Sequence, residues 1–186
     1  MGCCCSASGD GGGIEMAAVA APAVEVDPKR CGKAVKAEGN KISGAGVALA
    51  TDTLEQDSAY WECVVTKGSG KWAIGVAPKN EKDKEHIADS SALTAAEELE
   101  VKDGDVIGCV FSFSNFPVLQ FYKNGEAIDG QGVNKVKGDV YPAVSVSDGA
   151  ELELIFAEGQ FKHEPPSPKY TAVMKCQVRA RLLIVE

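Results

Sequence analysis

Residues 104–125 read GDVIGCVFSFSNFPVLQFYKNG, the clearest strand pattern in the chain. Within it, apolar side chains fall on alternate positions: Ile107, Cys109, Phe111 and Phe113, then Leu119 and Phe121. This period of two predicts β-strands, and Ser114–Pro117 divides the stretch into two of them. The flanking pairs Asp103–Gly104 and Asn124–Gly125 predict tight turns, and Asn-Gly is typical of a two-residue hairpin. We therefore expect antiparallel strands that follow one another directly.

Upstream, a second pair of strands is predicted on either side of Lys67–Gly70, which we expect to be a hairpin turn. Tyr60–Val65 alternates, and so does Trp72–Ala77. Ala73, Gly75 and Ala77 form a face of small residues, which another sheet can approach closely. Trp61, Cys63, Trp72 and Cys109 all lie within strand patterns, so we expect them in the core.

Further strand patterns occur in Val24–Ala50, Val140–Val146 and Leu152–Phe156. At least seven short strands with turn signals, and no convincing long helix, predict an all-β protein, an antiparallel β-sandwich. Residues 79–100 are rich in charge, which predicts a mobile surface loop with one helical turn at Thr94–Leu99. His86, among those charges, is expected to be a solvated side chain.

Three segments follow from these patterns. Residues 1–23 are rich in Gly, Cys, Ala and Pro, and are expected to form a flexible tail because they cannot bury enough apolar surface. Residues 24–170 form the predicted sandwich. Residues 171–186 form a C-terminal extension, approached through Phe161 and Pro165–Pro166, whose apolar end could add a strand or pack on an edge.

The N-terminus carries a lipidation pattern. Met1-Gly2 followed by Ser6 fits the motif for N-myristoylation of Gly2, and Cys3, Cys4 and Cys5 directly behind it are natural S-acylation sites. One myristoyl chain binds membranes with an association constant of only about 10⁴ M⁻¹, and no Lys or Arg precedes Lys29 to reinforce it. Stable attachment would therefore require the cysteines. The alternatives are a non-specific tail or a weak metal site, although no His lies nearby to complete a zinc set.

The sequence also argues against several functions. A net charge of −8 disfavours nucleic acid as a partner, because phosphate binding needs clustered Lys and Arg. No apolar run is long enough for a spanning helix, and the start does not resemble a secretory signal, so a cytosolic location or a cytosolic membrane face is expected. We find no motif for catalysis, metal binding or a cofactor, and predict no enzyme activity, cofactor or small-molecule substrate.

Several motifs together resemble one known family. They are Tyr60–Glu62 (YWE), Trp72–Ala77 (WAIGVA), Gly104–Gly108 (GDVIG), Phe121–Gly125 (FYKNG) and Val140–Val144 (VYPAV). In order and spacing these motifs are similar to those of the SPRY (B30.2-like) domain, over roughly residues 30–165. The resemblance implies a SPRY-type sandwich that is non-enzymatic as a rule and that holds partner peptides with loops at one end.

These observations give two functional hypotheses. The first is an adaptor, a sandwich tethered by acyl chains that presents its loops to a protein partner. Asn115 and Phe116, at a predicted loop tip, are the candidate partner contacts, although Phe116 could instead fold back over the core. The second is an unlipidated structural subunit of a large cytosolic or cytoskeletal assembly, for example an axonemal one.

Overall fold

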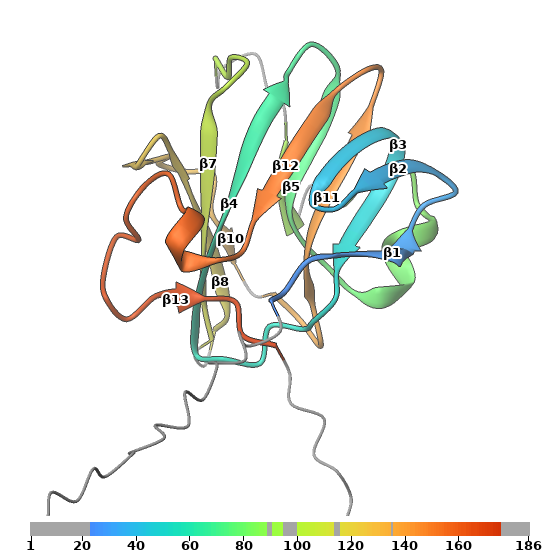
Figure 1. Cartoon of the computed structure of the whole chain (residues 1–186). Coiled ribbons are helices and arrows are strands. Elements are labelled where there is room, and N and C mark those ends of the chain that lie inside the picture. Colours follow the sequence, from blue (N-terminus) through green and yellow to red (C-terminus); the bar gives the residue numbers. More distant parts are fainter. Residues whose placement is uncertain (1–22, 89–90, 95–99, 114–115, 135, 176–186) are drawn as a thin grey trace, which may run out of the picture.

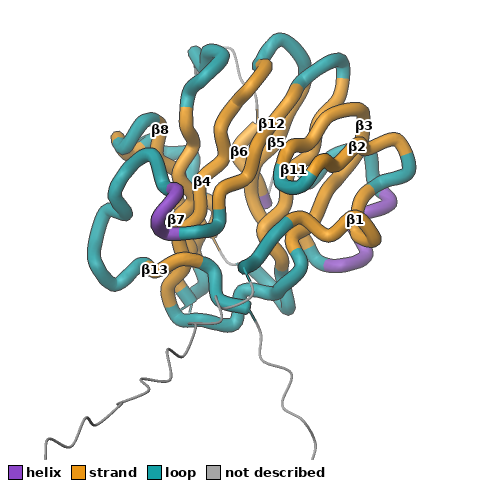
Figure 2. The backbone as a smooth tube through the Cα atoms, viewed as in Figure 1, coloured by secondary structure: helices purple, strands orange, loops and turns teal. Residues whose placement is uncertain are grey.

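The computed structural model describes residues 23–88, 91–94, 100–113, 116–134 and 136–175. The strands are β1 (Val26–Cys31), β2 (Ala34–Glu38), β3 (Lys41–Ala50), β4 (Ser58–Lys67), β5 (Lys71–Ala77), β6 (Ala92–Thr94), β7 (Val106–Ser112), β8 (Val118–Lys123), β9 (Glu126–Ala127), β10 (Val133–Asn134), β11 (Tyr141–Ser147), β12 (Glu151–Ile155) and β13 (Thr171–Ala172). The described residues also include two short 3₁₀ helices, η1 (Lys79–Asp83) and η4 (Glu158–Gln160). In the part of the chain that is described, strands and loops dominate (Figure 2), which confirms the all-β prediction.

The strands form two layers that share β3 (Figure 1). Sheet A has the order β1-β3-β11-β5-β6, and sheet B has the order β10-β8-β7-β4-β12-β3, with β2, β9 and β13 added along its strands. The first half of β3 pairs with β2 and β12 in sheet B, and its second half pairs with β11 in sheet A. All of these pairings are antiparallel except that of β13 with β4.

The crossing of β3 from one sheet to the other depends on glycine. Gly44 has a φ of +92°, and a Cβ there would lie 2.2 Å from the carbonyl oxygen of Ala34 on β2. Gly46 has a φ of +129°. Residues with side chains rarely adopt such backbone angles, so these two glycines allow the strand to bend where the sheets meet.

The core lies between the two layers and contains the residues expected there. Trp61, Cys63 and Cys109 are fully buried, and Trp72 is 3% exposed. Burial raises the pKa values of the Cys63 and Cys109 thiols well above their usual range, so both behave as apolar groups. Complete burial of a large side chain such as Phe111 contributes about 1.5–3 kcal/mol to folding.

Two turn predictions at the central strands are confirmed. β8 and β9 form a hairpin around Asn124 and Gly125, whose φ values are +50° and +88°. Gly104, in the turn before β7, has a φ of +91°. The predicted strand reaches one residue too far: β7 ends at Ser112, and Phe113, the last residue of the alternating pattern, is 55% exposed.

The predicted hairpin at Lys67–Gly70 is also wrong. β4 lies in sheet B and β5 in sheet A, so this turn carries the chain between layers. Gly70 fits closely at the crossing, where a Cβ would lie 2.3 Å from the carbonyl oxygen of Ser147. Alternation along two strands shows that both are strands but does not show that they pair with each other.

Residues 79–100 are more ordered than predicted wherever they are described. They contain η1 and β6, and Ile87 and Leu93 are each only 2% exposed. Ile87 and Ala92 pack on the small-residue face of β5, so this segment, rather than another sheet, covers that face. The predicted helical turn is not found at Thr94, which ends β6, and its other residues, 95–99, lie outside the described residues.

Candidate partner-binding groove

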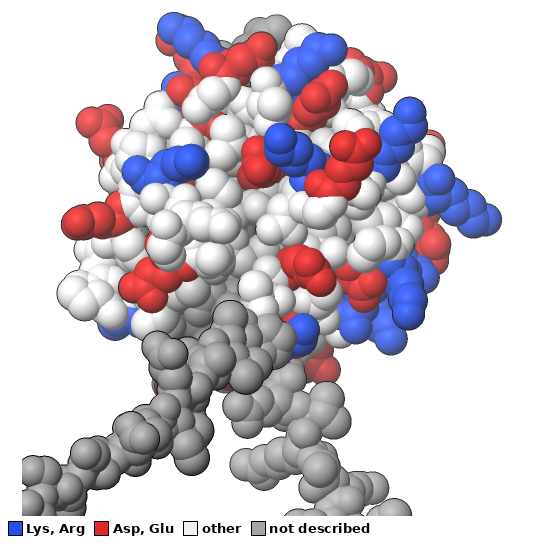
Figure 3. Space-filling model, in the orientation of Figure 1, with Lys and Arg blue, Asp and Glu red and all other residues white. Residues whose placement is uncertain are grey.

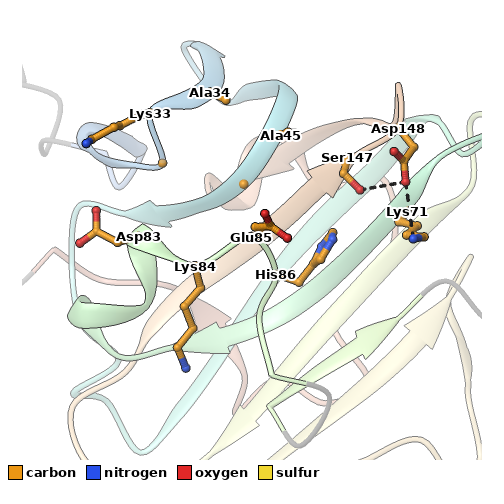
Figure 4. Close-up of a pocket in the computed structure, with 12 residues that line it drawn as sticks. Lys33, Ala34, Ala45, Lys71, Asp83, Lys84, Glu85, His86, Ser147 and Asp148 are labelled. Atoms are coloured by element: carbon orange, nitrogen blue, oxygen red, sulfur yellow. Dashed lines mark hydrogen bonds and ion pairs between the residues drawn. The ribbon is translucent and has the colours of Figure 1, made fainter.

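A groove of about 800 Å³ opens on the outer side of sheet A (Figure 4). Four segments form its walls: the β1–β2 connection, the bend of β3, the residues after η1, and the turn between β11 and β12 with the start of β5. The lining residues are Gly32, Lys33, Ala34, Ala45, Gly46, Lys71, Asp83, Lys84, Glu85, His86, Ser147 and Asp148.

Close backbone packing holds two of these walls together. The Gly32 N–H donates to the Val47 carbonyl oxygen at 2.8 Å, which fixes the β1–β2 connection against β3. A Cβ at Gly32 would lie 3.2 Å from the carbonyl oxygen of Lys82 in η1, so the absent side chain lets η1 approach. Downstream of η1, the Lys84 ammonium lies 2.9 Å from the Glu81 carboxylate. The groove is therefore built on strands and on a short helix fixed to them.

The groove carries charges of both signs. Lys33, Lys71 and Lys84 lie among Asp83, Glu85 and Asp148, and the Glu85 and His86 side chains project into the concavity (Figure 4). An ion pair across its rim, between Lys71 and Asp148 at 3.8 Å, joins side chains that are 77% and 63% exposed, so it contributes little to stability. A groove with open, solvated charges suits a polar extended peptide better than an apolar small molecule.

The wider surface shows a similar mixture. On the face drawn in Figure 3, basic and acidic side chains are interspersed over sheet B and the edge of sheet A. That face has no basic stripe of the kind that nucleic acid binding requires.

A buried carboxylate on sheet B fastens the C-terminal part of the chain. Glu62 on β4 is fully buried, and it accepts hydrogen bonds from the Lys162 N–H (2.6 Å) and the His163 N–H (2.8 Å). The Tyr60 hydroxyl donates to the same carboxylate at 2.9 Å, and the Phe161 ring packs edge-on against Tyr60 at 4.9 Å between ring centroids. Burial, and then the nearby Glu62, raise the pKa of Tyr60 well above its usual value.

This contact changes the expectation for the segment after β12. Phe161 and the prolines that follow were predicted to lead into a tail, but the chain from η4 to β13 packs along sheet B. Glu62 was read as one member of an alternating strand, and nothing in the local pattern separates a buried carboxylate from a solvated one. Its two backbone donors, at Lys162 and His163, lie 100 and 101 residues further along the chain.

A smaller polar network stabilises the turns at the ends of β7 and β8. Asp105 accepts hydrogen bonds from the Lys102 N–H (2.8 Å) and the Asn124 side chain (2.9 Å), and lies 3.4 Å from the Lys123 ammonium. Partial burial disfavours the charged carboxylate, but these donors and the lysine outweigh it and lower the pKa of Asp105. Asn124 also accepts the Val106 N–H, so one side chain joins both turns.

The residues predicted to be functional have different outcomes. Gly2, Cys3, Cys4, Cys5 and Asn115 lie outside the described residues. Phe116 is 66% exposed in the β7–β8 connection, so it does not fold back over the core. Among the described residues, no cluster of His, Cys, Asp and Glu could hold a metal ion, and no helix is long and apolar enough to span a membrane.

The groove itself was not predicted. His86 was expected to be solvated, and it is exposed, but it also lines the groove. The lining residues run from Gly32 to Asp148, so the site appears only when distant segments are brought together. The turn residues of each segment were visible in the sequence, but their common location was not.

Comparison with known proteins agrees with the motifs. Residues 90–159 match the SPRY domain family. Over this region the chain is similar to SPRY domains. It is 29% identical over 185 residues to SPRY domain-containing protein 7 of Homo sapiens and of Bos taurus, covering 88% of this chain and 90% of each relative. The same protein of Gallus gallus is 29% identical over 192 residues.

Among solved structures, the TRIM65 PSpry domain aligns with a TM-score of 0.47 and 11% sequence identity, covering 72% of this chain and 92% of that one. The SPRY fold is that of a protein-interaction module.

Proposed function

We propose that this SPRY domain is a non-enzymatic interaction module that binds an extended segment of a partner protein in the groove on sheet A. We further propose that the chain is tethered to the cytosolic face of a membrane by myristoylation of Gly2 and S-acylation of Cys3, Cys4 or Cys5. The groove is the observation that carries the first part of this proposal.

Three properties of the groove support peptide binding. It has room for several side chains, its walls are strands and turns fixed by backbone hydrogen bonds, and its charges of both signs are solvated. Binding residues on loops held by a rigid scaffold are typical of recognition domains. Peptide recognition requires only room, fixed walls and solvated charges, so we propose no catalytic role for the groove.

The tether follows from the sequence and from the energetics of lipid anchors. Since no Lys or Arg precedes Lys29, the thiols behind Gly2 are the available second anchor. A tethered module meets membrane partners at a high effective concentration, so a weak groove interaction is sufficient for function. Asn115 and Phe116 are proposed as a second contact of the tethered module, and Phe116 is not among the residues that line the groove.

The peptide-binding proposal is tested by selecting ligands from a displayed peptide library on the purified chain. Binding of a selected peptide is then measured by fluorescence polarisation with two variants. Ala45→Arg places a long side chain in the groove from an exposed position on β3, and Ala127→Arg makes the same change at an exposed position on β9. We expect Ala45→Arg to weaken binding at least tenfold and Ala127→Arg to leave it unchanged. Equal binding by both variants would rule out the groove.

The tether is tested separately by fractionating cells that express the native chain or Gly2→Ala. Gly2→Ala is expected to move the protein from the membrane fraction to the soluble fraction. Detergent distinguishes the structural-subunit alternative: a lipid-tethered protein is extracted, whereas a subunit of a large assembly stays in the pellet. Persistence of native protein in the detergent pellet would favour that alternative.

A further inference from the structure

The large apolar side chains that are exposed among the described residues gather at one end of the sandwich. Phe113, Phe116 and Met174 are 55%, 66% and 60% exposed. Phe113 and Phe116 belong to the same β7–β8 connection. Met174 lies at the same end because it and Phe113 both contact the segment 51–58. The Phe113 N–H donates to the Asp57 carbonyl oxygen, and the Met174 N–H donates to the Gln56 side chain, each at 2.7 Å. We call the end of the sandwich that carries these three side chains the apolar end.

The two ends of the described chain lie in the same region (Figure 1). At the N-terminal side, the Glu25 carbonyl oxygen accepts the Thr51 N–H at 2.8 Å, so the chain enters the sandwich beside the segment 51–58. At the C-terminal side, Lys175 directly follows Met174. The predicted acylation sites therefore precede, in sequence, a part of the chain that joins the sandwich at its apolar end.

The sequence beyond Lys175 adds to this arrangement. It contains Arg179 and Arg181, followed by the apolar run Leu182–Val185. Basic and apolar residues in one short segment are typical of chains that contact a bilayer surface. The sequence before residue 23 thus carries the predicted acylation sites, and the sequence after Lys175 has a composition that favours contact with lipid.

We propose that the apolar end docks on a lipid bilayer and inserts Phe113, Phe116 and Met174 at the boundary between headgroups and acyl chains. This inference rests on the proposed tether, and it deepens it by assigning an orientation to the module. Apolar contact is the main attraction, because Glu55 and Asp57 are exposed beside these side chains and would be repelled by anionic lipid.

Docking in this orientation leaves the groove accessible. β4 begins at Ser58, beside the apolar end, and ends at Lys67, near the turn that leads to Lys71 on the groove. Ten residues of strand span about 30 Å, so the Lys71–Asp148 rim would stand that far from the bilayer surface. The membrane and a partner protein can then bind at the same time.

The experiment uses the full chain, either unmodified or myristoylated on Gly2 by a co-expressed N-myristoyltransferase. Each form is mixed with phosphatidylcholine–phosphatidylserine vesicles, and binding is measured by flotation. We expect the double variant Phe113→Ser, Phe116→Ser to bind vesicles at least tenfold more weakly than the native chain. Moving one phenylalanine side chain from water to an apolar phase changes its partition coefficient by about that factor.

A second readout reports insertion directly. Phe116→Trp is expected to be quenched by vesicles of brominated phosphatidylcholine. The matched control Ser69→Trp, exposed in the turn at the far end of β4, should show no quenching beyond that of the buried Trp61 and Trp72. Both variants add one exposed tryptophan, so the comparison isolates its position.

Two outcomes would overturn the docking proposal. One is unquenched Phe116→Trp in a myristoylated chain that binds vesicles, which would leave the tether intact. The other is equal vesicle binding by the double variant; if that variant also loses a selected protein ligand, the apolar end is a protein contact. If the native chain proves to carry no acyl group, the tether fails, and the unmodified chain still tests docking through both readouts.

Discussion

Replacing Glu62 by alanine should release the C-terminal part of the chain from sheet B. The native carboxylate is fully buried and accepts three hydrogen bonds, from the Lys162 N–H, the His163 N–H and the Tyr60 hydroxyl. Alanine removes all three acceptor contacts at once. The two N–H groups can recover water only if the segment that carries them lifts away from β4.

The expected cost follows from these contacts. A hydrogen bond to a charged group contributes about 1.5–3 kcal/mol, and the loss of a buried acceptor leaves its donors to find water. Two of the three donors belong to one segment after η4, which can lift away from β4 and recover hydrogen bonds to water. We therefore expect a loss of about 3 kcal/mol in the free energy of unfolding rather than the full sum. For a domain of this size, that corresponds to a fall in Tm of about 6–12 °C.

The assay combines thermal unfolding with limited trypsin digestion. In the native protein, Lys162 and Lys169 lie between η4 and β13, on the segment that Glu62 holds, and in the alanine variant they should be cut early. Glu126→Ala, at an exposed position on β9, is the matched control and should leave both readouts unchanged. A Tm within about 2 °C of the native value, with no new cleavage at these lysines, would refute this account of Glu62.

Three further predictions follow from the packing and the turns. Gly75→Val should destabilise the fold by about 2 kcal/mol or more, because a Cβ there would lie 2.6 Å from the Ala92 Cα, and thermal unfolding measures this; an unchanged Tm would contradict it. Because the pKa of Asp105 is lower in the folded protein, Asp105 stabilises the fold above its unfolded-state pKa of about 4, and this stability is lost as pH falls through the folded pKa. Asp105→Asn should therefore flatten the acid side of a plot of Tm against pH. An identical plot would exclude this role. Cys63 and Cys109, buried and with raised pKa values, should resist iodoacetamide until the protein unfolds, and mass spectrometry of the native protein would reveal early labelling.

The sequence predicted the strands well because their periodicity is local. The alternation around Cys109 and Phe111, and the turn at Asn124–Gly125, depend on neighbours within a few residues, and the structure has them as expected. The prediction failed where pairing depends on distant segments. The turn after Lys67 looks like any short hairpin, yet it joins two layers because β4 has β7 and β12 as partners.

The charged segment after Pro78 shows a second limit. Its composition predicts a solvated loop, but Ile87 and Ala92 cover the face that the small residues of β5 leave open. The face of Ala73, Gly75 and Ala77 allows another segment to pack closely on it, but the sequence did not show which segment does so. The same reasoning applies to the groove, whose walls come from four separate parts of the chain.

Mass spectrometry of the N-terminal peptide, from protein isolated from its native cell without cleaving thioesters, tests the central claim of a membrane-tethered SPRY module most directly. We predict loss of Met1, a myristoyl mass on Gly2, and a hydroxylamine-labile mass on one or more of Cys3, Cys4 and Cys5. A retained Met1, or a plain acetyl group at the N-terminus, would contradict the tether.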